Sequence, residues 1–146
     1  MTNDLQIGTI RVSGIEVEVA GAPTDLYFQQ CLEQGDLFEP SVRIADLMLR
    51  DDPVILDIGA SIGGVPAAFA KRFPAGRVIA FEAAPSVHRS LRETVRRTNS
   101  DSITVVESAV VAEPGMLRFH EDGNGSGWEF LSEELGAALV PVVTVD

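Results

Sequence analysis

The sequence predicts an α/β fold: the first part of a doubly wound parallel sheet, preceded by an N-terminal hairpin and helices. Three observations indicate this. Short apolar segments typical of buried strands recur at 54–59, 77–82 and 103–111, segments with helical periodicity separate them, and a glycine-rich turn follows the first. Because strands in this order favour parallel pairing through right-handed crossovers, helices are expected on both faces of the sheet.

The first 50 residues predict a hairpin followed by two helices. Residues 7–20 alternate apolar and polar about Ser13-Gly14, which is typical of a β-hairpin. A helix is expected from a Thr24 cap to Gly35. A second helix follows in "EPSVRIADLMLR", with Pro40 in its first turn, and ends at Asp51-Asp52-Pro53.

Two helices are expected between the core strands, "GGVPAAFAKRF" and "SVHRSLRETVRRTN". After the third strand the pattern is less regular. It predicts a strand at 116–121, a loop at 122–128, one or two helical turns at 129–139 and a final strand at 140–145. The 146 residues are enough for one domain.

Charge and cysteine content exclude several classes of protein. With 22 acidic and 11 basic residues, the net charge of −11 disfavours nonspecific binding to nucleic acid or to an anionic membrane. Cys31 is the single cysteine, so an internal disulfide is excluded and a reducing compartment fits. No signal peptide and no apolar stretch of membrane-spanning length is present. We expect a cytoplasmic protein.

The turn Gly59 to Gly64 reads G-A-S-I-G-G and joins the first core strand to a helix. In open α/β sheets such a turn faces the crevice that binds ligands, and its amides suit a nucleotide-like molecule. A dinucleotide fingerprint has glycine at the third position, where the backbone approaches a pyrophosphate. Ser61 occupies that position here. S-adenosylmethionine has no phosphate and is compatible with this side chain, so an NAD-dependent enzyme is disfavoured.

Two acids lie at the predicted strand ends. Glu82, 23 residues after Gly59, can accept hydrogen bonds from both ribose hydroxyls of either cofactor. Asp57 can meet the ammonium of S-adenosylmethionine, whereas it would repel a pyrophosphate. The alternative is structural: Asp57 caps the loop, and Glu82 caps the following helix. The two acids combined with three glycines favour a ligand site.

These segments, in this order, resemble class I S-adenosylmethionine-dependent methyltransferases of the FkbM type. The resemblance covers about residues 35 to 146 and rests on "GDLFEP", "VILDIGASIGG", "VIAFEAAP", "RRTN", "ITVVESAV" and "VPVVTVD". It implies a Rossmann-like sheet. We therefore expect one domain with an N-terminal hairpin and helical lead-in at 1–50, a cofactor-binding βαβαβ core at 51–112 and a substrate-side hairpin and loop region at 113–146. Ser61 stands where the family usually has Asn, and Ala83 where Pro is common.

The resemblance also implies roles for individual residues. Glu82 would hold the ribose, and Glu39 would close over the cofactor. The methionine side of the pocket would be formed by Asp57, Gly59, Ala60 and Gly63. Ser108 and Ala109 would lie near the adenine edge. In the family a further strand follows the "VVTVD" segment, so we expect this chain to be an incomplete domain.

The expected reaction is methyl transfer to a hydroxyl of a small molecule or sugar, for which no base can be named. His88 is expected to be an ordinary surface residue. His120, Ser126 and Trp128 are substrate-side candidates, although a solvated His120 and a Trp128 packed over the sheet are the commoner outcomes. No metal site is expected. The alternative function is a noncatalytic module: either a cofactor-binding half-domain, or a remnant completed by self-association. The partner expected for self-association is a second copy, in a homodimer through the open sheet edge.

Overall fold

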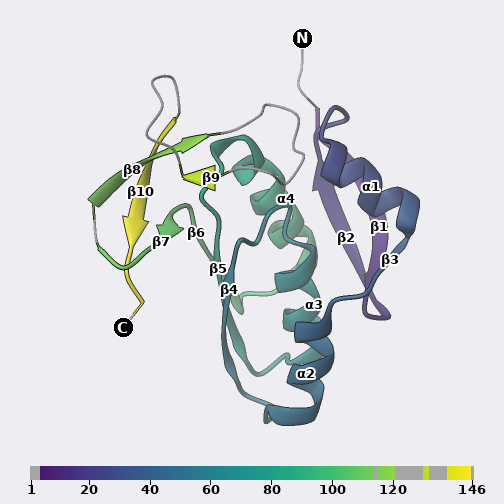
Figure 1. Ribbon diagram of the computed structural model, residues 1–146. Coiled ribbons are helices and arrows are strands. Elements are labelled where there is room, and N and C mark those ends of the chain that lie inside the picture. The colour runs from purple at the N-terminus through teal and green to yellow at the C-terminus, as the bar shows by residue number, and fades with distance from the viewer. Residues whose placement is uncertain (1–3, 114, 121–129, 132–137, 146) are drawn as a thin grey trace.

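The computed structural model describes residues 4–113, 115–120, 130–131 and 138–145. Three sheets and a layer of helices make up the fold (Figure 1). A three-stranded parallel sheet and an N-terminal sheet lie on opposite sides of the helices α3 and α4, and a four-stranded sheet lies beyond the parallel one. The predicted α/β fold with a parallel sheet is confirmed.

The N-terminal unit is the predicted hairpin with its two helices. The turn at Ser13 and Gly14 has positive φ angles of 49° and 85°, which a tight hairpin turn requires. The elements are β1 (Gln6–Val12), β2 (Ile15–Gly21), α1 (Leu26–Gln34), β3 (Asp36–Leu37) and α2 (Pro40–Met48). The two-residue strand β3, which runs parallel to β1, was not predicted because it is too short to show alternation.

Helix α1 begins later than the sequence indicated. Its cap is Asp25, whose carboxylate accepts a hydrogen bond from the backbone N–H of Phe28 at 3.0 Å. The predicted cap at Thr24 is therefore wrong by one residue. Both residue types are good caps, and the choice depends on where the buried Phe28 and Cys31 must lie against the hairpin.

The predicted βαβαβ core is confirmed. All of its strands are parallel, in the order β4-β5-β6, which places β4 at an edge. The elements are β4 (Val54–Ile58), α3 (Gly64–Arg72), β5 (Arg77–Phe81), α4 (His88–Thr98) and β6 (Ile103–Val106), with a single 3-10 turn (Pro85–Val87) before α4. Strand β2 packs on the other side of α3 and α4, and the Thr94 hydroxyl accepts the backbone N–H of Ala20 at 2.9 Å.

The expectations of a buried first strand and of helices on both faces of the sheet are wrong for the described residues. Val78 and Ala80 point towards α3 and are buried. On the other face Val54, Leu56 and Ile58 are 56%, 40% and 60% exposed. An apolar run cannot by itself show which of its two faces is covered, because that depends on elements elsewhere in the chain.

The C-terminal strands form a sheet with the order β7-β10-β8-β9. The predicted strand at 103–111 divides at Glu107-Ser108, because β6 pairs with β5 whereas β7 pairs with β10. The elements are β7 (Ala109–Val110), β8 (Gly115–His120), β9 (Phe130–Leu131) and β10 (Ala138–Val143). No helix in the described part of the chain is long and apolar enough to cross a membrane.

The helical turns predicted for 129–139 are wrong at both described ends of that segment. Residues 130–131 pair with β8, and 138–139 begin β10. Pairing with β8 supplies the backbone hydrogen bonds that a short, weakly periodic helix would otherwise have made internally. Residues 129 and 132–137 lie outside the described residues.

Candidate ligand site at the glycine loop

The loop between β4 and α3 is fixed to the end of β5. The backbone N–H groups of Gly59 and Ala60 both donate to the carbonyl of Phe81, each at 2.9 Å. Gly59 and Gly63 have φ angles of 89° and 91°, and Ser61 has 48°. This left-handed backbone explains the glycines, because side chains are strained in that region. The loop therefore leads from the sheet directly into the N-terminus of α3.

Glu82 supports this loop from the end of β5. Its side chain is buried, with one carboxylate oxygen accepting the Ser61 N–H at 2.7 Å and the other accepting the Ala84 N–H at 2.8 Å. These contacts support the structural role that the sequence analysis gave as the alternative for Glu82. Each carboxylate oxygen has a further acceptor position, so the ribose contact stays a prediction.

Asp57 has a different environment. Its Oδ2 atom is buried, and no hydrogen-bond partner for it lies within the described residues. Burial, followed by the nearby negative charges of Glu39 and Glu82, raises the pKa of Asp57 from 3.8 to about 6. A buried carboxylate without a partner is costly. A ligand that brings a hydrogen-bond donor or a positive charge would remove that cost.

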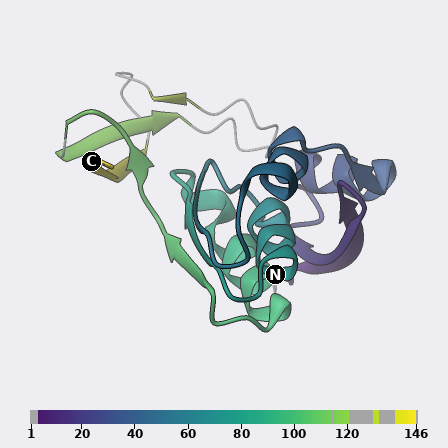
Figure 2. The ribbon, with the colours of Figure 1, turned by 90° about the horizontal axis from the view of Figure 1, so that it is seen from below.

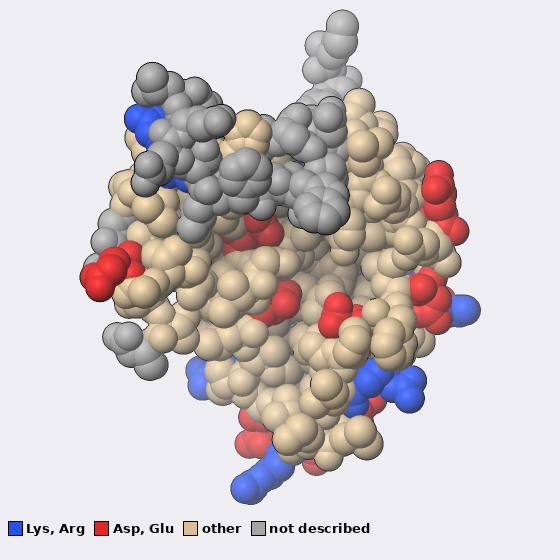
Figure 3. Space-filling model, viewed as in Figure 1, with Lys and Arg blue, Asp and Glu red and all other residues tan. Residues whose placement is uncertain are grey.

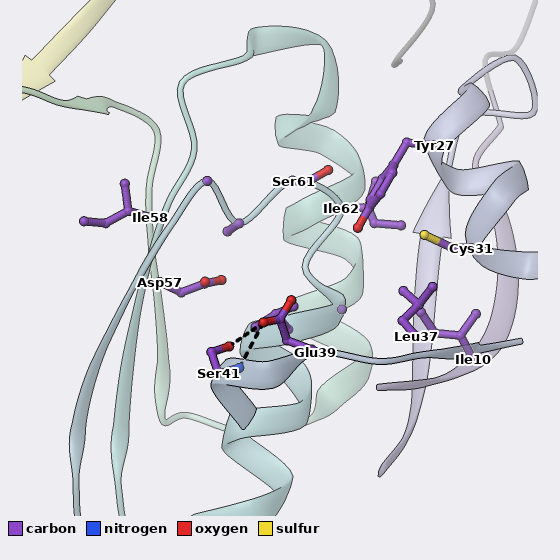
Figure 4. Close-up of a pocket in the computed structure, with 14 residues that line it drawn as sticks. Ile10, Tyr27, Cys31, Leu37, Glu39, Ser41, Asp57, Ile58, Ser61 and Ile62 are labelled. Carbon is purple, nitrogen blue, oxygen red and sulfur yellow. Dashed lines mark hydrogen bonds between the residues drawn. The ribbon is translucent and has the colours of Figure 1, made fainter. Parts of the chain in front are cut away.

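Asp57 and the loop line a cavity of about 300 Å³ between the parallel sheet and the N-terminal unit (Figure 4). In the close-up, Asp57 points into this space from β4 and Glu39 approaches from below it. The sheet side of the lining is Asp57, Ile58, Gly59, Ala60, Ser61, Ile62, Gly64 and Val65, and the N-terminal side is Ile10, Tyr27, Cys31, Leu37, Glu39 and Ser41. No basic side chain is among these residues.

Surface charge agrees with that lining. The face seen in Figure 1 is hollowed at its centre, where acidic side chains are visible among uncharged ones (Figure 3). Basic side chains of the described residues lie towards the margins of this view. A hollow lined by one sign of charge raises the local concentration of ligands of the opposite sign. The site therefore favours a ligand with a cationic group.

Glu39 connects the cavity to the hairpin. Its side chain caps α2 by accepting from the backbone N–H of Ser41 at 3.1 Å and from the Ser41 hydroxyl at 2.8 Å. Its backbone N–H donates to the Ser13 hydroxyl at 2.9 Å, and its carbonyl accepts from that hydroxyl at 2.9 Å. The hairpin turn thus fixes the position of an acid that faces the cavity.

Tyr27 and Cys31 are cavity residues that the sequence did not reveal. They are four residues apart on α1, and both line the cavity from the N-terminal side. Burial is the main cause that raises the pKa of Tyr27 above its usual range. Helical spacing shows only that two such residues share a face. That this face meets the loop follows from the packing of the N-terminal unit.

Other predicted site residues lie away from this cavity lining. Ser108 is buried, and its hydroxyl donates to the Pro141 carbonyl at 2.8 Å, while Ala109 pairs with Val142 in the C-terminal sheet. His120 ends β8 beside the buried Phe119 and is half-buried. The adenine and substrate roles of these residues remain predictions. Ser126 and Trp128 lie outside the described residues.

His88 is not the surface residue that the sequence indicated. Only 12% of its side chain is exposed. Its Nε2 atom lies 3.0 Å from the carbonyl oxygen of Glu82, and its Nδ1 atom lies 3.6 Å from a Glu107 carboxylate oxygen. Arg92 also pairs with Glu107. The start of α4 therefore links the ends of β5 and β6. Among the described residues, no three His, Cys, Asp or Glu side chains are grouped to hold a metal ion.

Comparison with known proteins finds no matching family model and no matching curated protein. Solved structures are similar over part of the chain. A precorrin-6y C5,15-methyltransferase from Geobacter metallireducens is 31% identical over 47% of this chain and 36% of its own, with a TM-score of 0.42. Methyltransferase FkbM from Methylobacillus flagellatus is 21% identical over 65% of this chain and 23% of its own, with a TM-score of 0.46.

TYW2 from P. horikoshii, solved in complex with MeSAdo, is 18% identical over 74% of this chain and 37% of its own, with a TM-score of 0.47. This chain therefore spans less than half the length of each of the three proteins.

Proposed function

We propose that this chain binds S-adenosylmethionine at the glycine loop and is an S-adenosylmethionine-dependent methyltransferase domain of the FkbM type. The observation that supports this most directly is Asp57, whose buried Oδ2 atom has no partner among the described residues and lines the cavity. The ammonium of the cofactor's amino-acid end supplies the donor and the charge that this carboxylate needs.

The loop contacts argue against a dinucleotide. The N–H groups of Gly59 and Ala60 are bonded to Phe81, and that of Ser61 is bonded to Glu82. They are therefore engaged within the protein rather than free for phosphate oxygens. Asp57 and Glu39 in the same lining would also repel a pyrophosphate. A nucleoside cofactor without phosphates avoids both conflicts.

In this proposal Asp57 binds the ammonium, and the loop residues Gly59, Ala60, Ser61 and Gly63 shape the methionine end. Glu82 holds the ribose while keeping its contacts to the loop, and Glu39 covers the cofactor. Ser108 and Ala109, which are not among the residues that line the cavity, are the proposed neighbours of the adenine. The bound cofactor supplies a methyl group activated by its sulfonium, and the protein orients it and excludes water.

The acceptor in this proposal is a hydroxyl of a small molecule or sugar. The acidic charge supports such an acceptor over a nucleic acid. His120, Ser126 and Trp128 are its proposed neighbours, and no base is assigned. The buried, free Cys31 fits the reducing conditions of a cytoplasmic protein.

A second candidate is a noncatalytic module that binds the cofactor without transferring its methyl group. The exposed apolar face and unpaired edge of β4 favour it, since they leave one side of the sheet uncovered in the described structure. A chain that binds S-adenosylhomocysteine but methylates no hydroxyl acceptor would support this module over the enzyme.

The test is calorimetric titration of S-adenosylhomocysteine into the 146-residue chain and its Asp57→Asn variant. Asn keeps the shape of the side chain but removes the charge, so we expect affinity to fall about tenfold or more. Asp101→Asn, an exposed acid in a turn, is the matched control and should bind normally. NAD binding in place of S-adenosylhomocysteine would overturn the cofactor proposal, as would equal affinity of the Asp57→Asn variant.

A further inference from the structure

Glu82, the acid proposed to hold the ribose, lies just beyond the parallel sheet. Strand β5 ends at Phe81, whose register partner in β6 is Val106. The backbone N–H of Glu82 donates to the Val106 carbonyl at 3.0 Å. This contact anchors the peptide group before the Glu82 Cα atom to β6. The direction of the side chain also depends on what holds the peptide group that follows.

His88 holds that following peptide group. Its Nε2 atom lies 3.0 Å from the Glu82 carbonyl oxygen. Because a carbonyl oxygen only accepts, Nε2 carries the hydrogen and donates it. Peptide groups are planar, so fixing the one on each side of a Cα atom also fixes the direction of its Cα–Cβ bond. Strand β6 and His88 together therefore orient the Glu82 carboxylate.

The position of His88 is itself fixed by packing. It is the first residue of α4 and follows the 3-10 turn Pro85–Val87. Helix α4 lies in the layer of helices between the parallel sheet and the hairpin (Figure 2). Val87 and Leu91 are buried, and the His88 side chain itself is only 12% exposed. An imidazole held in this way can keep the residue that it contacts in one orientation.

We propose that His88 is a positioning residue for ribose recognition, which keeps the Glu82 carboxylate in the orientation that accepts both ribose hydroxyls. This inference rests on the proposed function, because it takes Glu82 as the ribose acid. The carboxylate already accepts the N–H groups of Ser61 and Ala84. The acceptor positions left for a ligand therefore point in few directions, and a rotation of the Glu82 backbone would misdirect them.

Arg92 provides a matched control near the same imidazole. The Nδ1 atom of His88 lies 3.6 Å from a Glu107 carboxylate oxygen, which is beyond hydrogen-bond distance. Arg92, one turn along α4, pairs with the same carboxylate and is 57% exposed. Exposed ion pairs contribute little to stability. Arg92→Gln therefore alters the surroundings of His88 without removing the contact to the Glu82 carbonyl.

The experiment compares two ligands by calorimetry: S-adenosylhomocysteine and its 2′,3′-dideoxy analogue, which lacks both ribose hydroxyls. His88→Phe keeps a planar ring but has no donor. We expect its affinity for S-adenosylhomocysteine to fall about tenfold and its affinity for the analogue to change less than about threefold. His88→Gln keeps an N–H donor on a side chain of similar reach and should restore most of the lost affinity. Arg92→Gln should bind both ligands as the wild type does.

Circular dichroism and thermal melting establish that each variant is folded. An equal loss for both ligands in His88→Phe would show a general structural role and would overturn the proposal, as would no loss for either. A wild type that binds neither ligand would overturn the proposed function as well.

Nitrogen-15 NMR of the wild-type imidazole at about pH 8 tests the contact without a ligand or a variant. We expect a hydrogen on Nε2 in the folded protein. A ring with its hydrogen on Nδ1 alone could not donate to the Glu82 carbonyl, so that result would overturn the proposal even if His88→Phe does not fold.

Discussion

The carboxylate of Glu82 accepts the backbone N–H of Ser61 at 2.7 Å and so joins the end of β5 to a left-handed residue of the glycine loop. Its other oxygen accepts the N–H of Ala84. The acid expected to hold a ribose therefore also maintains the loop that shapes the ligand cavity. A substitution at Glu82 would therefore change both the structure of the loop and the proposed contact with the ligand.

Replacing Glu82 should destabilise the fold even without a ligand. Glu82→Ala leaves the buried N–H of Ala84 and the partly buried N–H of Ser61 without an acceptor, which we expect to cost about 2–4 kcal/mol in the free energy of unfolding. Glu82→Gln keeps one acceptor oxygen and should lose about half as much. Urea denaturation measures both, with the exposed Glu113→Ala as control. Equal stability of Glu82→Ala and the wild type would show that the loop does not need these bonds.

Asp57 should make stability depend on pH. Its pKa is raised from 3.8 to about 6, so the folded state keeps the proton over a range in which the unfolded chain releases it. Its contribution is therefore most favourable below pH ~4 and declines as pH rises to ~6, by up to about 3 kcal/mol. Urea unfolding from pH 4 to 7 should show this decline in the wild type and not in Asp57→Asn. Parallel curves for the two proteins would contradict it.

Glu39 should influence the titration of Asp57. The negative charge of Glu39 is the second cause of the raised pKa, after burial. Glu39→Gln removes that charge and keeps an oxygen that can cap α2, so the pKa of Asp57 should fall towards its ordinary value. NMR titration of the Asp57 side chain measures the change, and Glu33→Gln on α1 is the control. An unchanged pKa in Glu39→Gln would mean that burial and Glu82 determine it without Glu39.

Two glycines of the loop should differ in their tolerance of a methyl group. Both have left-handed φ angles, so Ala is strained at either position, at about 1–2 kcal/mol. A Cβ at Gly63 would also lie 2.9 Å from Leu91, whereas a Cβ at Gly59 meets open space. Gly63→Ala should therefore lower the urea midpoint more than Gly59→Ala. Equal midpoints for the two variants would contradict this and would show that Leu91 adjusts without cost.

The sequence predicted the features of the fold that depend on local pattern. The hairpin at 7–20 has a turn signal between alternating segments, and the core strands alternate with clear helices. The parallel sheet brings the carboxyl ends of β4 and β5 together. The prediction that Asp57 and Glu82 lie at these neighbouring strand ends is therefore correct.

Features that depend on partners distant in sequence were not predicted. β3 exists because β1 lies beside it, and residues 130–131 are extended because β8 pairs with them. Tyr27 reaches the cavity only through the packing of α1 against the hairpin. The enclosure of His88 likewise depends on Glu82 and Glu107, which come from two different strand ends.

The sheet formed by β1, β2 and β3 has a consequence for how the protein can be shortened. It covers the side of α3 and α4 that faces away from the parallel strands. The packing is close at Gly64, where an added Cβ would be in van der Waals contact with Ile10 and Val19. The same unit holds Glu39 through Ser13. Deleting the hairpin would therefore uncover the hydrophobic core and dismantle the cavity at once, so the amino-terminal segment is as much a part of the folding unit as the parallel sheet.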